Sequence, residues 1–294
     1  MVVIRGAGKG GGGGGSPRVP EEEDDSLSSV QFASVLDAIS EGEIDGIEGG
    51  AKGVYLDGTP LQDAAGRDNF TGYTLTTRDG TQAQSYISDR AGVESEKNVG
   101  LAVVKATPIT RQITDTEVDR VRVTLQIPAL QVVEDDGDIR GTSVNIQIQV
   151  QYNSGGFTTV VDDTINGKSS SAYQRDYMIT LTGAFPVDIK VVRVTDDSTS
   201  QRLANGTNWS SYTEIIDEKL RYPNTALSFL KLDSRQFSNI PSRKYLVRGV
   251  KVKIPHNATV DTTTHIGRIT YSGGFNGTLG AATWTNDPAW LLYA

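Results

Sequence analysis

Alternating apolar and polar residues dominate the middle of the chain. The pattern has a period of two from Arg120 to Ile127 and again from Val144 to Tyr152. Because successive side chains of a strand point to opposite faces, each run predicts a strand with one core face and one wet face. Further strands are predicted at residues 157–161, 177–181 and 189–194. Several strands with turns between them predict an antiparallel β-sandwich of the immunoglobulin-like or fibronectin-like kind at residues 113–200.

The segment from Trp209 to Phe237 joins two apolar runs through a Tyr-Pro-Asn corner. Pro223 lacks an amide proton and fixes its own φ, so a continuous helix through it is disfavoured and Tyr222 is expected to be extended. Residues 225–232 are almost continuously apolar, which predicts a strand buried on both faces. The run before the corner, residues 212–220, fits either a strand or a short helix.

Shorter elements are predicted nearer the N-terminus. Apolar residues from Phe32 to Ile39 recur at positions i, i+3, i+4 and i+7. This spacing predicts a short amphipathic helix that ends at Gly42, and a strand is the alternative. Short strands are predicted at residues 54–56 and 73–77, because an Asp-Gly turn pair follows each of them.

Residues 1–25 contain a glycine tract followed by the acidic stretch SPRVPEEEDD. Such a composition cannot bury enough apolar surface to offset the entropy of ordering, so a flexible arm is predicted. The glycines formally satisfy the pattern G-x-G-x-x-G, but no predicted strand precedes them and no helix follows, so we predict no nucleotide cofactor. Either the arm threads along a neighbouring subunit on assembly, or it has no role.

Composition narrows the classes of function. The 294 residues are 37% hydrophobic, enough for a sizeable core, and the net charge of −8 disfavours binding to a phosphate backbone. No run approaches the roughly 18 apolar residues of a membrane span, and the N-terminus lacks the apolar region of a signal peptide, which predicts synthesis in the cytoplasm. The absence of cysteine excludes disulfides and thiol nucleophiles.

Two acidic stretches are candidates for chemistry. Glu41, Glu43 and Asp45 share one loop, but the sequence shows no partner that would shift their pKa values, so no catalytic role is assigned. Residues 134–138 (EDDGD) have the composition of a calcium loop without the EF-hand spacing, and a solvated loop is the preferred interpretation. The chain also lacks a G-x-S-x-G elbow. We therefore predict a protein without catalytic, cofactor or metal sites.

Four stretches, in order along the chain, resemble segments of one family. They are residues 34–46 (SVLDAISEGEIDG), 107–114 (TPITRQIT), 209–237 and 242–249 (SRKYLVRG). The family is that of the tail-tip attachment (host-specificity) protein J of lambda-like long-tailed bacteriophages. The resemblance implies a mainly β fold with few short helices, in which a β-rich tail-hub domain at residues 26–112 and 201–294 holds the inserted sandwich.

The resemblance further implies a structural, non-enzymatic role as the N-terminal hub region of a tail tip. Three copies would form a homotrimeric ring that joins the tail tube to the receptor-binding distal part and surrounds the DNA exit path. The expected partners are other tail-tip and tail-tube proteins and the tape-measure protein, without sequence-specific nucleic-acid binding or a membrane segment. The expected location is the virion, after assembly in the cytoplasm of the bacterial host.

Known relatives in this family continue beyond this chain. We therefore do not carry receptor binding over to it, and the hub domain is expected to be incomplete at its C-terminal end. Contacts between subunits are the predicted sites, and ordinary core packing is the competing interpretation for the aromatic ones. The candidates are Glu41 and Glu43, which match the family's Ser-Glu-Gly loop, and Trp209, Tyr212, Glu214 and Tyr222.

The alternative function is a carbohydrate-binding or glycan-cleaving β module. Three tryptophans and many tyrosines would suit stacking against sugars, and a pair of acids could hydrolyse a glycosidic bond. Binding to nucleic acid is disfavoured by the charge and by the lack of a basic stripe.

Overall fold

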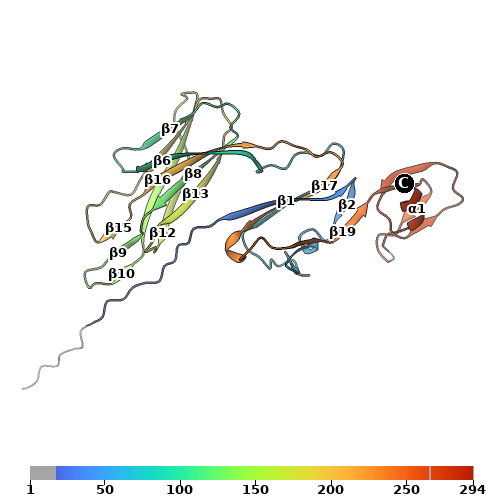
Figure 1. The fold of residues 1–294 in the computed structure, drawn as a ribbon, viewed down its shortest axis with the longest axis horizontal. Helices are drawn as coiled ribbons and strands as arrows, with labels where there is room; N and C mark the ends of the chain where they lie inside the picture. Colours follow the sequence, from blue (N-terminus) through green and yellow to red (C-terminus); the bar gives the residue numbers. More distant parts are fainter. Residues whose placement is uncertain (1–17, 265, 294) are drawn as a thin grey trace, which may run out of the picture.

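The structure is a computed structural model that describes residues 18–264 and 266–293. Figure 1 shows three parts along its long axis: a β-sandwich at one end, a three-stranded sheet in the middle, and a small C-terminal unit at the other end. Strands make up nearly all of the regular structure, and α1 (Pro288–Tyr293) is the only α-helix among the described residues. The predicted mainly β fold with few short helices is confirmed.

Two four-stranded antiparallel sheets form the sandwich, with the strand orders β13-β8-β16-β6 and β12-β11-β14-β7. Val121, Val123 and Leu125 are fully buried between the sheets, whereas the polar residues between them are partly exposed. Each such side chain stabilises the fold by about 1.5–3 kcal/mol. The strands are β6 (Ala91–Ala102), β7 (Ile109–Ile113), β8 (Arg120–Ile127), β11 (Thr142–Tyr152), β12 (Thr158–Gly167), β13 (Tyr173–Thr180), β14 (Val187–Arg193) and β16 (Asn208–Asp217). A small sheet beside them contains β9 (Gln131–Val133), β10 (Ile139–Arg140) and β15 (Leu203–Ala204).

The sandwich extends beyond the predicted residues 113–200. It begins with β6, and it ends with β16, which lies between β8 and β6. The two apolar runs around Pro223 therefore belong to different parts. The first is a strand of the sandwich, and the second is the central strand of the middle sheet. The sequence pattern could not show this, since β6 is a largely exposed edge strand without an apolar stripe.

The middle sheet has the order β1-β17-β5 and contains β1 (Phe32–Glu41), β5 (Tyr73–Asp79) and β17 (Thr225–Asp233). β17 pairs on both sides and is buried along most of its length, as its apolar sequence predicted. The helix predicted at residues 32–39 is wrong, because this segment is strand β1. Val35 and Leu36 are adjacent and lie on opposite faces of the sheet, so the apolar spacing imitates a helix while the ladder with β17 determines the conformation.

Short elements connect the middle sheet to the rest of the chain. β19 pairs with β2, and β18, β3 and β4 form a further sheet. Their bounds are β2 (Ile44–Ile47), η1 (Gly50–Gly53), β3 (Val54–Leu56), β4 (Thr59–Pro60), η2 (Ser234–Gln236), β18 (Arg243–Tyr245) and β19 (Val247–Val250). The predicted strands 54–56 and 73–77 are present, and Asp57 and Gly58 between β3 and β4 both have positive φ, 48° and 87°, as a tight hairpin turn requires.

The C-terminal unit is built from two strand pairs and α1. β20 pairs with β23, and β21 pairs with β22. Val252, Ile254 and Ile269 form its small core, against which Trp290 of α1 packs. The strands are β20 (Val252–Pro255), β21 (Ala258–Val260), β22 (Ile269–Tyr271) and β23 (Leu279–Thr283).

The N-terminal stretch contacts the sandwich where the structure describes it. Residues 18–29 run extended along the sandwich, and Glu22 forms a parallel bridge with Ile139 of β10. The Glu23 N–H donates to the Ile139 carbonyl at 2.9 Å. Residues 1–17, which contain the glycine tract, lie outside the described residues.

Replacing Leu230 with alanine tests the central role of β17. Leu230 is fully buried in a cluster with Val54, Leu56 and Leu61. We expect Leu230→Ala to lower the free energy of unfolding by about 2–5 kcal/mol in urea titrations, because it removes buried methyl groups and leaves a cavity. Leu292→Ala is the matched control, since that side chain is 89% exposed. Equal effects of the two changes would contradict this assignment of the core.

Candidate subunit-contact site

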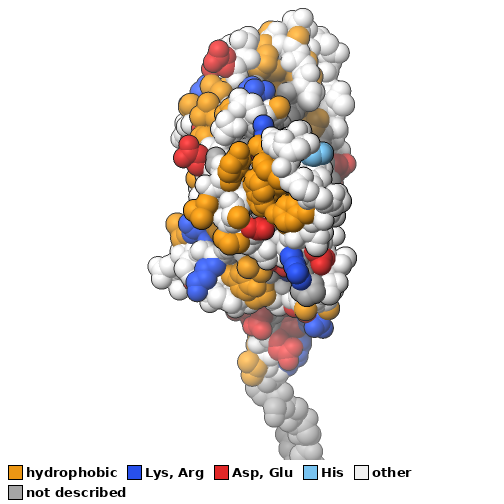
Figure 2. All heavy atoms as spheres, turned by 90° about the vertical axis from the view of Figure 1, so that its right-hand side faces the viewer, with side chains coloured by type: hydrophobic (Ala, Val, Ile, Leu, Met, Phe, Trp, Pro, Cys, Tyr) orange, Lys and Arg blue, Asp and Glu red, His pale blue; other side chains and the backbone are white. Residues whose placement is uncertain are grey.

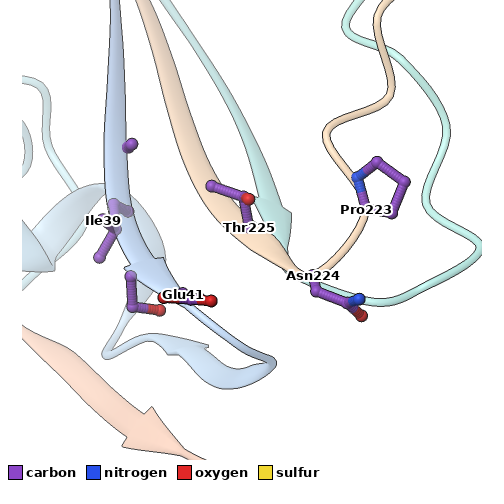
Figure 3. Close-up of a pocket in the computed structure, with 7 residues that line it drawn as sticks. Ile39, Glu41, Pro223, Asn224 and Thr225 are labelled. Carbon is purple, nitrogen blue, oxygen red and sulfur yellow. The ribbon is translucent and has the colours of Figure 1, made fainter.

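The end of β1 and the Tyr-Pro-Asn corner meet at a shallow hollow. It has a volume of about 520 Å³ and is lined by residues 38–41 on one side and 223–225 on the other (Figure 3). The Gly42 N–H donates to the Asn224 carbonyl at 2.7 Å, which fixes the corner against the strand end. The fold thus joins two of the stretches on which the family resemblance rested.

The backbone of the corner is held in an uncommon conformation. Tyr222 and Asn224 both have positive φ, 48° and 58°. Asparagine tolerates this region, whereas for tyrosine it costs of order 1–3 kcal/mol. The extended conformation predicted for Tyr222 is therefore wrong. The Gln84 amide holds the corner by donating to the carbonyls of Arg221, Tyr222 and Thr225 at 2.9, 2.6 and 3.0 Å.

Close backbone approach fixes one further position at this corner. Gly80, at the end of β5, has φ 89°, and a Cβ there would lie 2.6 Å from the Gly42 carbonyl oxygen. Only glycine fits this contact without displacing the backbone. The ends of β5 and β1 therefore approach each other in the same place as the corner.

Five of the six predicted contact residues fall into two groups. Glu41 is exposed beside the hollow, and Tyr222 is partly buried in the corner. Trp209, Tyr212 and Glu214 lie on β16, where they are 0%, 7% and 7% exposed. The indole N–H of Trp209 donates to the Ser211 carbonyl at 2.9 Å, and Glu214 accepts from Lys97 at 2.6 Å. These three side chains offer little surface to another subunit, and their burial favours the core-packing interpretation.

Glu43 and Asp45 form ion pairs rather than a catalytic pair. Lys251 contacts Glu43 at 2.9 Å, and Arg248 lies 3.7 Å from Asp45. The guanidinium of Arg248 also lies over the Trp284 ring, 5.7 Å from its centroid. The loop after β1 is thus tied to β19 and through it to the C-terminal unit. Contact roles for Glu41, Glu43 and Tyr222 stay predictions.

A charged clasp of Asp37, Arg243 and Tyr245 was missed in the sequence. Arg243 donates to the Asp37 carboxylate at 2.5 and 3.1 Å, and the Tyr245 hydroxyl donates to it at 2.5 Å. The hydrogen bond from Arg243 holds the pKa of Asp37 below its usual value, and burial raises the pKa of Tyr245 to about 12 with help from Asp37. The clasp fastens β1 to β18.

The signal for the clasp lay in two separate stretches. Residues 34–46 contain Asp37, and residues 242–249 contain both of its partners. Each stretch resembled the family separately, but a single sequence does not show that a carboxylate pairs with residues more than 200 positions away. Only the sheet topology brings them together.

The acidic loop at residues 134–138 forms ion pairs with arginine side chains of the same chain. Asp136 and Asp138 both pair with Arg18, and Asp135 pairs with Arg202. Within residues 18–264 and 266–293, no group of histidine and acidic side chains is arranged to hold a metal ion.

Aromatic side chains gather on the surface of the C-terminal unit. Trp290 packs edge-to-face on Phe275 and Tyr293, at centroid distances of 5.4 and 5.3 Å, and its N–H donates to the Tyr271 hydroxyl at 2.7 Å. Phe275 and Tyr293 are nevertheless 42% and 64% exposed. Figure 2 looks onto this unit and shows hydrophobic side chains clustered on its face.

Comparison with known proteins identifies the family. The profile described as “Tip attachment protein J, FNIII-A domain” matches residues 93–218, which correspond to the sandwich from β6 to β16. The tip attachment protein J of Escherichia phage SECphi4 is 42% identical over 279 residues, or 93% of this chain. The chain belongs to the tip attachment protein J family. The protein of the same name from Escherichia phage SECphi27 is 34% identical over 94% of the chain.

The chain spans about a quarter of the length of these relatives, 24% and 23%. A structure from Sulfurospirillum deleyianum covers 44% of this chain and is itself fully covered, at 14% identity and a TM-score of 0.25. A second, titled “CBM4 structure and function”, covers 63% of this chain and 92% of its own, at 11% identity and a TM-score of 0.20. These two structural similarities are too low to indicate a shared fold or function. Among the described residues, no helix has the length and apolar character needed to cross a membrane.

The clasp makes stability depend on pH. Because the folded-state pKa of Asp37 is depressed, its contribution is present above the unfolded pKa, near 3.8, and is lost as the pH falls through the folded value. We expect Asp37→Asn to lower the free energy of unfolding by about 1.5–3 kcal/mol at pH 7, and by progressively less below pH 4. Urea titrations from pH 7 to pH 2.5 measure this. Glu48→Gln, at an exposed acid outside the clasp, is the control. A constant difference at every pH would contradict the charged clasp.

Proposed function

We propose that this chain is a structural part of a phage tail tip, the hub region that joins the tail tube to the receptor-binding distal part. The observation that carries this proposal is the 42% identity over 93% of the chain with a tip attachment protein J. In this role the middle sheet and the C-terminal unit are the hub, and the sandwich is a module inserted into it. The partners are other tail-tip and tail-tube proteins, and the location is the virion.

The hub is a homotrimeric ring with head-to-tail contacts, in which one surface of a subunit meets a different surface of the next. Two exposed features support this arrangement. The first is the hollow beside Glu41, a carboxylate that forms no ion pair with another described residue. The second is the aromatic face around Trp290, because exposed apolar patches on soluble proteins mark interaction surfaces.

The role is non-enzymatic. The ion pairs that the acidic side chains form within the chain support it. Glu43 and Asp45 pair with Lys251 and Arg248, and the aspartates of the acidic loop pair with arginines. These carboxylates fasten elements to one another. A ring around the path of the DNA and the tape-measure protein suits a net charge of −8, because such a lumen repels phosphate and does not retain it.

Light scattering across a dilution series tests the ring. We expect a species with the mass of three chains of 31.6 kDa. Glu41→Arg is expected to lower the fraction of trimer by about tenfold, since the corner would then carry the wrong charge for its neighbour. Glu117→Arg, at an exposed position on a sandwich loop, is the control. A single chain at all concentrations would contradict self-assembly of this region.

The exposed aromatic face also fits the carbohydrate-binding alternative, because aromatic rings stack on sugars. Titration of the chain with bacterial polysaccharide separates the two functions. Saturable binding that Trp290→Ala abolishes, without any change of mass in solution, would favour the glycan module over the hub.

A further inference from the structure

The surface of the sandwich carries two buried charges of opposite sign. The side chains of Asp138, beside β10, and of Lys168, after β12, are only 1% and 2% exposed. A buried charge is costly unless a partner neutralises it. Both residues lie at the margin of the sandwich, outside its apolar core, so something on this surface must cover and pair them.

The arm segment, which we define as residues 18–29, does both. Arg18 donates to Asp138 at 2.5 Å and also pairs with Asp136. Further along the segment, Glu22 and Asp25 each accept from the Lys168 ammonium at 2.9 Å. Along the segment a basic residue comes first and the acidic residues follow. On the surface the acidic Asp138 and the basic Lys168 lie opposite them, so the charges of segment and surface are complementary.

Asp25 is the most strongly held of these acids. It accepts from the Ser170 N–H at 3.0 Å and from the Ser170 hydroxyl at 2.6 Å, in addition to Lys168. The hydrogen bond from the Ser170 hydroxyl contributes most to lowering the pKa of Asp25 to about 2. The carboxylate is therefore charged at any physiological pH.

Backbone contacts and shape add to this complementarity. The N–H groups of Ser26 and Leu27 donate to the Lys168 carbonyl at 3.0 and 3.1 Å. A Cβ on Gly167 would lie 2.7 Å from the Ser26 hydroxyl oxygen and 3.0 Å from Leu27. A side chain at that position would displace the segment, so the surface is shaped to receive it.

The segment also reaches the middle sheet. The Ser29 hydroxyl accepts from the Gln174 N–H of β13 at 2.9 Å, while the Ser28 hydroxyl accepts from Arg235, next to the end of β17, at 2.8 Å. The two other crossings between these parts are residues 80–90 and 218–224, which contain no strand. The segment is a third connection, and it is attached at both ends.

We propose that β10, the loop 134–138 and residues 167–170 form a docking surface whose ligand is this chain's own arm segment, and that the docked segment locks the sandwich against the middle sheet. Ion pairs of Arg18 and Lys168 act together with backbone hydrogen bonds to hold the segment. Release exposes Asp138 and Lys168 to water, which solvates the unpaired charges. High salt favours release, because it screens the ion pairs.

The absence of cysteine provides a clean reporter in the full chain. In the variant Ser29→Cys/Gln174→Cys, the two thiols are the only ones, and the rate at which added oxidised glutathione converts them to an intrachain disulfide reports docking. We expect Arg18→Glu or Lys168→Glu to slow this rate at least about tenfold, the effect of losing one charge-assisted hydrogen bond. About 1 M NaCl, where the Debye length is roughly 3 Å, should also slow it.

Two controls make the result specific. Lys105→Glu breaks the ion pair with Asp196, at 2.5 Å elsewhere on the sandwich, and should leave the rate unchanged. Combining Lys168→Glu with Glu22→Lys should restore part of the lost rate, because this ion pair re-forms with its charges exchanged while Asp25 keeps its hydrogen bonds from Ser170. If Lys168→Glu fails to fold, Arg18→Glu decides the test, since the Arg18 side chain is 52% exposed.

Rates that are insensitive to Arg18→Glu and to salt would overturn the docking. Disulfides between differently tagged copies, in place of those within one chain, would overturn the assignment of the chain's own segment as ligand. Small-angle scattering tests the lock: we expect a broader distribution of interatomic distances in Arg18→Glu than in Lys105→Glu, and identical distributions would overturn the locking.

Discussion

The hydrogen-bonded ladder between β5 and β17 is the constraint on which the whole arrangement depends. The entire sandwich lies between these two strands in the sequence, so the ladder pairs residues that are far apart along the chain. Ala226 pairs with Asp79 at the point where the sandwich is inserted. Closing a loop of this length as a disordered chain would cost substantial entropy. The sandwich removes that cost, since its first and last strands are neighbours and Ala91 lies opposite Asp217. Because the sandwich is folded, the chain leaves it close to the point where it entered, and β17 can pair with β5.

The sequence predicts the strands whose environment is simple. β8 and β11 have one buried face and one wet face, and β17 is buried on both, so periodicity and apolar content identify them. β1 misleads because its apolar residues lie on both faces of the sheet, so their spacing matches that of a helix. β6 misleads in the opposite way, since an exposed edge strand carries no apolar stripe. The limits of the sandwich were misplaced for this reason, and Trp209 was assigned to the wrong part.

The candidate site was less predictable than the fold, because it depends on pairings between distant residues. Glu41 and the corner were both singled out, but their proximity follows from the β1–β17 ladder. Asp37 looked like an ordinary polar residue on a helix face until β18 placed Arg243 beside it. Tyr222 shows the same limit in the backbone, since the Gln84 amide stabilises a conformation that a residue before proline rarely adopts.

The exposed edge of β6 has a consequence for solubility. A long strand with a free edge is a template onto which a strand of another molecule can add, and repeated addition gives insoluble sheets. β6 has twelve residues, and it carries Glu94, Glu96 and Lys97 in succession with Ser95. Charges along such an edge oppose the approach of an identical strand. These charges therefore disfavour polymerisation of the sandwich through the edge of its own sheet.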